Sequence, residues 1–268
     1  MKLRLWQVDA FAEKPLEGNP AAVIPLDQWI DEHLMQKIAN ENNLAETAFF
    51  VRTMPGKYDL RWFTPEVEVP LCGHATLASA WTIFTFLDPA LAALDFQTKS
   101  GTLTVTRGEP RNSMSLPSDT VTPCQEPGLA KKIGESLNAQ APQEVYRGKN
   151  LMGVWQDPKI VRRLEGPGSI AQILREFDLG GFIATAQGDE GFDFISRYFA
   201  PTKGIPEDPV TGGAHTALTP FWSKRLGKKT LKARQVSPRG GNLLCTDAGA
   251  RTILEGSCSL YMRGDIEI

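Results

Sequence analysis

The 268-residue sequence has little of what marks several protein classes. None of its four cysteines, Cys72, Cys124, Cys245 and Cys258, shows the paired spacing of a metal site. The net charge is −2 and basic residues occur in isolated pairs, so the concentrated positive charge of a nucleic-acid binder is absent. No low-complexity segment occurs either. We therefore expect a soluble globular protein with no metal site, no disulfide framework and no nucleic-acid partner.

Long hydrophobic runs are also lacking. Met1 leads directly into an alternating pattern instead of a basic region followed by an apolar stretch, which predicts a cytoplasmic protein. Residues 69–87 carry no Asp, Glu, Lys or Arg, but several proline, glycine and polar residues interrupt the segment. The uninterrupted part, residues 77–87, is too short to cross a bilayer, so no membrane partner is expected.

What the sequence does have is an internal repeat. RWFTP at residues 61–65 precedes PLCGHA at 70–75, and RYFAP at 197–201 precedes PVTGGA at 209–214. Two domains of about 130 residues each would suit the chain length. Prolines cluster near residues 117–127, so we predict a first domain over residues 1–118 and a second over 119–268, leaving open that the C-terminal segment returns to the first.

Strand patterns dominate both halves and are separated by turn residues, as in antiparallel sheets. The predicted strands cover residues 2–11, 46–52, 59–64, 94–98, 102–107, 113–116, 151–156, 181–186, 192–200, 232–237, 251–255 and 257–262.

Four helices are predicted. Residues 27–40 and 169–177 have the pattern of surface helices, the second opening with Ser169 and Gln172 as a capping box. The other two begin near Gly73 and Gly212, and their first turns are uncharged on every side, so each must be buried inside a wrapped sheet. Pro220 is expected to kink the last helix. The predicted fold is α+β, with two duplicated domains in which a mostly antiparallel sheet or barrel surrounds a central helix.

The two helix starts are the first candidate binding elements. Their leading N–H groups lack partners within the helix, and glycine at Gly73, Gly212 and Gly213 would let a ligand approach the backbone. Two such helix ends facing one cleft between the domains would bind a carboxylate and stabilise developing negative charge. The alternative is that the glycines only turn the chain into a packed helix. Occurrence of the same pattern in both halves favours binding.

Glu46 is the candidate catalytic base, because it begins an otherwise apolar strand where partial desolvation would raise its pKa. The alternative is an exposed glutamate at a strand end. His74, at the helix start, is a candidate proton donor or shuttle, and a buried core histidine is its alternative. Asp208 is a candidate for orienting a substrate amine or hydroxyl, or else caps the turn into the second helix.

Cys72 raises a rival mechanism, in which two thiols act on opposite faces of a carbon. The repeat places Thr211 at the equivalent position, so the second thiol is missing. We interpret Cys72 as a small buried residue at the edge of the substrate site.

These motifs together resemble the phenazine-biosynthesis PhzF-like isomerase family, which has the diaminopimelate epimerase fold. The matching stretches are VDAF at 8–11, GNPA at 18–21, ETAF at 46–49, the segment 63–76, and EDPVTG at 207–212. The resemblance implies an active site between two domains, a catalytic glutamate at Glu46, and supporting roles for His74 and Asp208. It places Asn19 among the residues near substrate, and it implies homodimers and a reaction without a cofactor.

One position departs from the family pattern. After Thr211 and Gly212 the family commonly has serine, whereas this chain has Gly213, which affects substrate identity more than fold. The resulting hypothesis is a cofactor-independent isomerase that moves a proton on a small carboxylic or amino acid through Glu46. An amino-acid racemase or epimerase using Cys72, and a non-catalytic small-molecule-binding protein of the same fold, stay open as alternatives.

Overall fold

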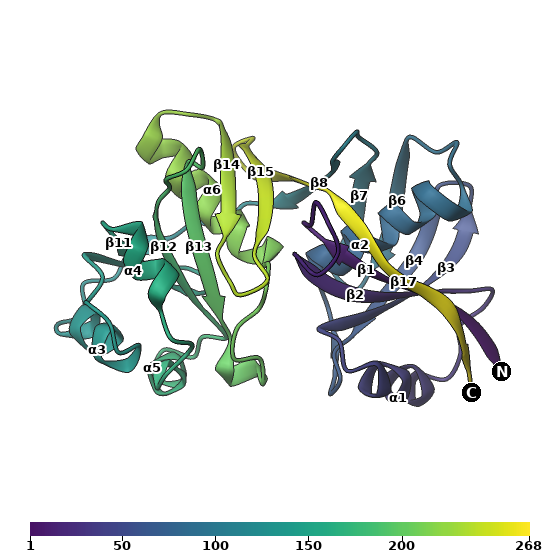
Figure 1. Ribbon diagram of the computed structural model, residues 1–268, viewed down its shortest axis with the longest axis horizontal. Helices are drawn as coiled ribbons and strands as arrows, with labels where there is room; N and C mark the ends of the chain where they lie inside the picture. The colour runs from purple at the N-terminus through teal and green to yellow at the C-terminus, as the bar shows by residue number, and fades with distance from the viewer. The chain divides into compact units, whose positions relative to one another are not determined.

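A computed structural model describes residues 1–268, and the chain forms two compact units (Figure 1). Unit 1 comprises Met1–Leu116 and Ile253–Ile268, and unit 2 comprises Pro117–Thr252. The C-terminal segment thus belongs to the unit that contains the N-terminus, the arrangement that the sequence left open.

Unit 1 contains strands β1 (Lys2–Ala10), β2 (Asn19–Leu26), β3 (Glu46–Met54), β4 (Lys57–Phe63), β5 (Glu68–Val69), β6 (Ala93–Thr98), β7 (Gly101–Thr106), β8 (Asn112–Pro117) and β17 (Cys258–Glu267), of which β8 ends at the boundary. Its helices are α1 (Glu32–Asn42), α2 (Gly73–Thr82) and the π-helical turn η1 (Ile83–Leu87).

Unit 2 contains strands β9 (Thr122–Pro123), β10 (Glu144–Arg147), β11 (Leu151–Trp155), β12 (Phe182–Gln187), β13 (Phe194–Phe199), β14 (Thr230–Gln235) and β15 (Gly241–Asp247), while β16 (Arg251–Gly256) crosses the boundary. Its helices are α3 (Leu129–Ser136), α4 (Pro158–Arg163), α5 (Ile170–Glu176), the 3₁₀ turn η2 (Pro201–Lys203) and α6 (Gly212–Leu226).

The two units share one topology. In unit 1, β1 pairs antiparallel with β2, β2 parallel with β3, β3 antiparallel with β4, β4 parallel with β6, and β6 antiparallel with β7. In unit 2, β10 to β15 repeat the same series of pairings in the same order. Each parallel pair is joined through a helix, as parallel neighbours require. The predicted α+β class with duplicated, mostly antiparallel sheets is confirmed.

The central helices are buried because they carry no polar face. Eight of the ten residues of α2 are buried, and the helix packs against β1, β2 and β3. Helix α6 is buried over its first half, passes through Pro220 without ending, and stops at Gly227, which has the left-handed conformation. In unit 1, Figure 1 shows α1 well separated from α2. Helix α1 packs its Met35 and Ile38 in a cluster with Phe49 and Phe63.

Several local predictions need correction. The first helix begins at Glu32, not near residue 27, because the Asp31 carboxylate caps it by accepting from the Leu34 N–H. Ser169 forms no side-chain cap; its carbonyl accepts from the Gln172 N–H instead. Strands β2, β10 and β15 and helices α3 and α4 were not predicted. None of the helices combines the length and apolar character needed to cross a membrane.

Candidate active site

Four of the predicted site residues meet in unit 1 at the ends of three elements. Asn19 is the first residue of β2, Glu46 the first of β3, and His74 the second of α2, with Cys72 immediately before that helix. Strands β2 and β3 are parallel neighbours that start at the same edge, with Ala21 paired to Glu46. Because α2 packs against both strands, its start brings His74 and Cys72 to that edge.

His74 is the centre of this cluster. Its Nε2 lies 3.0 Å from Glu46 Oε2, while its Nδ1 lies 3.2 Å from Asn19 Nδ2 and 3.5 Å from Cys72 Sγ. The His74 side chain is 6% exposed and that of Glu46 is 13% exposed. Glu46 is therefore largely desolvated, in agreement with the environment inferred from its apolar strand.

The contact between Glu46 and His74 is close but poorly aligned. The Oε2–Nε2 distance suits an ion pair, yet neither atom has a hydrogen-bond partner of acceptable direction, although both are buried. Buried polar atoms without such partners are costly, and they occur in native proteins mainly where function requires them. The pair is therefore a candidate site of proton transfer.

Charge in the cluster is set by burial and by Glu46. Burial lowers the pKa of His74, but the interactions of its ring with Cys72 and Glu46 outweigh that effect and raise the pKa well above its ordinary value. Burial, with a smaller contribution from Glu46, raises the pKa of Cys72 to about 11, so the thiol is neutral near pH 7. The Glu46 carboxylate is then the negative charge that holds a proton on His74.

The start of α2 provides hydrogen-bond donors at the same place. The first intrahelical backbone bond runs from Thr76 N–H to the Cys72 carbonyl, so the N–H groups of Gly73 and His74 precede the helical ladder. No side chain caps this helix. The N–H groups and the helix dipole can thus stabilise an anion beside Glu46 and His74.

The predicted residues of unit 2 lie around the start of α6. The Thr211 hydroxyl donates to Asp208 Oδ2, and the fully buried Gln235 side chain accepts from the Thr211 N–H at 2.9 Å and donates to the Asp208 carbonyl at 2.7 Å. Gly212 and Gly213 open the helix, with Gly212 buried and Gly213 exposed. Gln235 was not predicted, because it lies 24 residues after the motif that it holds.

Comparison with known proteins decides the family. The model for "Phenazine biosynthesis-like protein", PhzC-PhzF, matches residues 8–264. The chain belongs to this family. It is 45% identical over its full length, and over the full length of the relative, to an uncharacterised isomerase of Pseudomonas aeruginosa. It is also similar to the crystal structure of a PhzF-family protein of Enterococcus faecalis, with a TM-score of 0.91, 42% identity and full coverage of both chains.

More distant likeness concerns the fold alone. A hydroxyproline epimerase of Agrobacterium vitis superposes with a TM-score of 0.64 at 10% identity, over 99% of this chain and 92% of that one. The PhzF-like family and the epimerase-type fold are thus established for this chain, and membership supports an isomerase-type activity.

At Gly213 this PhzF-family chain has room for the side chain that it lacks. A Cβ built at Gly213 would meet no atom within 4 Å, and the residue has an ordinary helical backbone. Steric contacts within unit 2 therefore do not account for glycine in place of serine at position 213.

An arginine–glutamate clamp precedes each central helix and was missed from the sequence. Arg61 binds both carboxylate oxygens of Glu68 through Nε and Nη2, at 2.8 Å each, and Arg197 binds both oxygens of Glu207 at 2.7 Å each. Each clamp fixes the segment between a strand and a helix start. The signal was present, since the arginine opens both repeated blocks and a glutamate precedes both helices.

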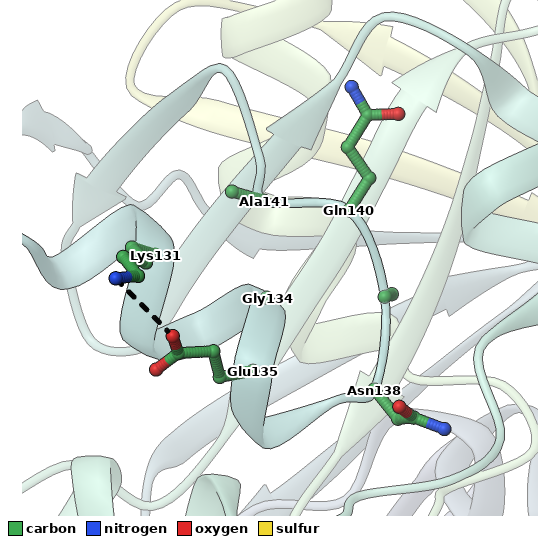
Figure 2. Close-up of a pocket in the computed structure, with 7 residues that line it drawn as sticks. Lys131, Gly134, Glu135, Asn138, Gln140 and Ala141 are labelled. Carbon is green, nitrogen blue, oxygen red and sulfur yellow. Dashed lines mark ion pairs between the residues drawn. The ribbon is translucent and has the colours of Figure 1, made fainter.

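A surface pocket beside α3 contains none of the predicted site residues. Figure 2 shows Lys131 and Glu135 on one side and the segment Asn138–Ala141 on the other. Lys131 and Glu135 form an exposed ion pair at 3.7 Å. With no buried titratable group among its lining residues, this pocket offers no catalytic chemistry.

Proposed function

We propose that this PhzF-family protein is a cofactor-independent isomerase that moves a proton between positions of a small carboxylic or amino acid, with Glu46 taking and returning the proton. The observation that carries the proposal is the buried contact between Glu46 and His74 at the start of α2. A desolvated carboxylate held beside a partner is suited to proton transfer near neutral pH.

The two oxygens of Glu46 would have different roles. Oε2 lies against His74 Nε2, so Oε1 is the oxygen left to approach an acidic C–H group. His74, whose pKa is raised by its acidic neighbours, would hold Glu46 in place beside the substrate. After Oε1 has taken the proton, the same oxygen can deliver it to another carbon, which completes an isomerisation without net change in atoms or electrons.

Removal of the proton places negative charge on the substrate carboxylate. The free N–H groups of Gly73 and His74 and the positive end of α2 would stabilise that charge, and one such donor is typically worth about 3 kcal/mol of barrier. Asn19, whose side-chain amide lies 3.2 Å from His74 Nδ1, would limit the rotation of the His74 ring. Asp208, held by Thr211 and Gln235, would orient a polar group of the substrate.

Deuterium exchange tests this function on a panel of candidate substrates. Wild-type protein is incubated in D₂O with small amino and carboxylic acids, and incorporation at carbon is followed by NMR. Glu46→Gln should abolish the exchange seen with the wild type, because the amide cannot accept the proton. Glu41→Gln is the matched control, since Glu41 is exposed on α1 near β3. Undiminished exchange in Glu46→Gln would contradict the proposal.

The racemase alternative depends on Cys72. Its thiol touches His74, which favours a place in the site, but its pKa of about 11 and its burial make it a poor base. Loss of exchange in Cys72→Ser together with full exchange in Glu46→Gln would support this alternative. Saturable binding of a carboxylate by wild-type protein with no exchange under any condition would instead support a non-catalytic binding protein.

A further inference from the structure

The carbonyl group just before each central helix accepts a hydrogen bond from a buried side chain one turn further on. In unit 1 the Thr76 hydroxyl donates to the Cys72 carbonyl at 2.5 Å, and both Thr76 and its counterpart His215 are 0% exposed. In unit 2, His215 Nδ1 lies 2.8 Å from the Thr211 carbonyl. The repeat aligns Cys72 with Thr211, and each donor lies four residues later. Two chemically different donors therefore make the same contact in both units.

The contact made by His215 has a defined direction. A carbonyl oxygen can only accept, so Nδ1 carries the hydrogen and donates. Burial lowers the pKa of His215 to about 4, so the ring is neutral near pH 7 and its Nε2 carries no hydrogen. Nε2 is buried without a hydrogen-bond partner, which leaves the bond to Thr211 as the one hydrogen bond of the ring. In both units the side chain thus donates to the carbonyl.

Each of these carbonyl groups shares a peptide unit with the glycine N–H at the start of a helix. The peptide is planar, so a hydrogen bond on the Cys72 oxygen also fixes the direction of the Gly73 N–H at the opposite end. Thr211 and Gly212 share a peptide in the same way. Both glycine N–H groups precede the hydrogen-bond ladder of their helix. Because linked hydrogen bonds polarise one another, a donor at the carbonyl also strengthens the N–H as a donor.

Other hydroxyl groups of α2 form the same type of bond without this consequence. The Ser79 and Thr82 hydroxyls donate to the carbonyls of Ala75 and Ala78, as polar side chains inside apolar helices commonly do. The N–H groups of those two peptides lie inside α2 and belong to its regular ladder. Among the three hydroxyls, that of Thr76 alone holds a peptide whose N–H precedes the ladder.

We propose that Thr76 in unit 1 and His215 in unit 2 are positioning residues, each of which orients and strengthens a glycine N–H that binds a carboxylate group. The ligand class, a small carboxylate, is that of the proposed function, on which this inference rests. Complete loss of one such donor typically lowers kcat by about 100- to 1000-fold. Valine in place of Thr76 keeps the Gly73 N–H but releases its peptide, so we expect a smaller loss, about tenfold.

Isotope labelling can report the Gly73 N–H alone. Cys72–Gly73 is the only Cys-Gly pair in the sequence, so ¹³C at cysteine carbonyls with ¹⁵N at glycine gives one amide signal with carbon–nitrogen coupling. Titration of the wild type with sodium acetate, against sodium chloride at equal ionic strength, should shift this signal saturably. Thr76→Val, which is similar in shape but has no hydroxyl, should bind acetate about tenfold more weakly.

Two variants separate positioning from a general effect on the helix. Thr76→Ser keeps the hydroxyl and should bind acetate as tightly as the wild type. Thr82→Val removes an equally buried hydroxyl of α2 whose bonded peptide lies inside the helix, so it should also bind as the wild type does. The backbone N–H of residue 76 still donates to the Cys72 carbonyl, so Thr76→Val should retain the fold, which circular dichroism checks.

The same experiment applies to unit 2 and covers the case in which Thr76→Val folds poorly. Thr211–Gly212 is the only Thr-Gly pair, so ¹³C at threonine carbonyls selects the Gly212 amide. The side-chain amide of His215→Asn can donate from the position of Nδ1 and should retain acetate binding at Gly212. His215→Leu has no donor and should weaken that binding about tenfold.

Activity of the same variants distinguishes the positioning role from the proposed isomerase. In deuterium exchange, Thr76→Val should lower kcat about tenfold, whereas Thr76→Ser and Thr82→Val should match the wild type. Acetate binding that depends on Thr76, without exchange on any substrate, would support positioning and contradict the isomerase. An acetate-independent Gly73 signal in the wild type, unchanged acetate affinity in folded Thr76→Val, or an equal loss in Thr82→Val would overturn the positioning role.

Discussion

Replacement of His74 by glutamine measures how strongly Glu46 and His74 depend on each other. The two side chains are 13% and 6% exposed and their charged atoms are 3.0 Å apart. Removal of one member of a buried pair leaves the other charge without compensation and typically costs about 3–5 kcal/mol. Both side chains keep slight solvent exposure, which weakens the penalty for an uncompensated charge. We therefore expect His74→Gln to lower the free energy of unfolding by about 3 kcal/mol, the lower end of this range.

The double variant separates the pair interaction from simple loss of packing. In Glu46→Gln/His74→Gln no charge is left buried, so the double variant should lose clearly less stability than the two single variants added together. The summed losses in free energy of unfolding of the two single variants should therefore exceed the loss in the double variant by about 2 kcal/mol. A coupling energy of this size is typical of residues in direct contact. Urea unfolding of all four proteins, followed by circular dichroism and tryptophan fluorescence, gives this coupling energy.

The coupling should also depend on pH in a defined direction. The pKa of His74 is raised in the folded protein above its ordinary value of 6.5. Below pH 6.5 both the folded and the unfolded chains hold the proton, so the stabilisation is complete there; it declines as the pH rises through the folded pKa. His33→Gln, at an exposed position, is the control and should shift stability by less than about 0.5 kcal/mol. Additive effects within about 0.5 kcal/mol at pH 6 would refute the reasoning.

Three other perturbations have predictable results. Burial lowers the pKa of His215 to about 4, so the folded chain resists protonation and should lose about 3 kcal/mol of stability between pH 6.5 and 4; His215→Gln should flatten that dependence in urea unfolding. Arg197→Ala strands the largely buried Glu207 and should cost about 3–5 kcal/mol, whereas an unchanged melting temperature would show that the clamp contributes nothing. Gly213→Ser should leave stability within about 0.5 kcal/mol, because its Cβ meets open space, and should alter which carboxylates bind, as measured by calorimetry.

The sequence was informative where the chemistry is local. The uncharged turns after Gly73 and Gly212 predicted buried helices, because a helix without a polar face has no stable position at a surface. Alternation of polar and apolar residues predicted most strands, because side chains along a strand point to opposite faces of the sheet. Strand β2 was not predicted, because residues 19–26 have no polar side chain after Asn19 and therefore show no alternation of polar and apolar residues.

The contacts of the site residues with one another could not be predicted from the sequence. Glu46 and His74 are 28 residues apart, and only the parallel pairing of β2 with β3 beneath α2 brings them into contact. Gln235 holds the Asp208 loop from β14, a strand whose glutamine looks like any other polar residue. Such contacts depend on register, which is fixed by the packing of whole sheets.

The duplicated fold explains why only one unit carries the proposed base. Thr47 pairs with Phe63 in unit 1 as Phe182 pairs with Phe199 in unit 2, so the residue before Phe182, Gly181, corresponds to Glu46.

A side chain at Gly181 would require Tyr198 to move, because its Cβ would lie 2.1 Å from the Tyr198 hydroxyl. That hydroxyl donates to Asn150 at 3.0 Å, and burial raises the pKa of Tyr198, so it stays neutral. Tyr198 thus fills in unit 2 the space that a carboxylate occupies in unit 1, while the arginine–glutamate clamp is retained in both. The arginine–glutamate clamp, present in both units, serves the shared fold. The glutamate at position 46 has no counterpart in unit 2, which favours a proton transfer with one base over a mechanism with a symmetric pair of bases.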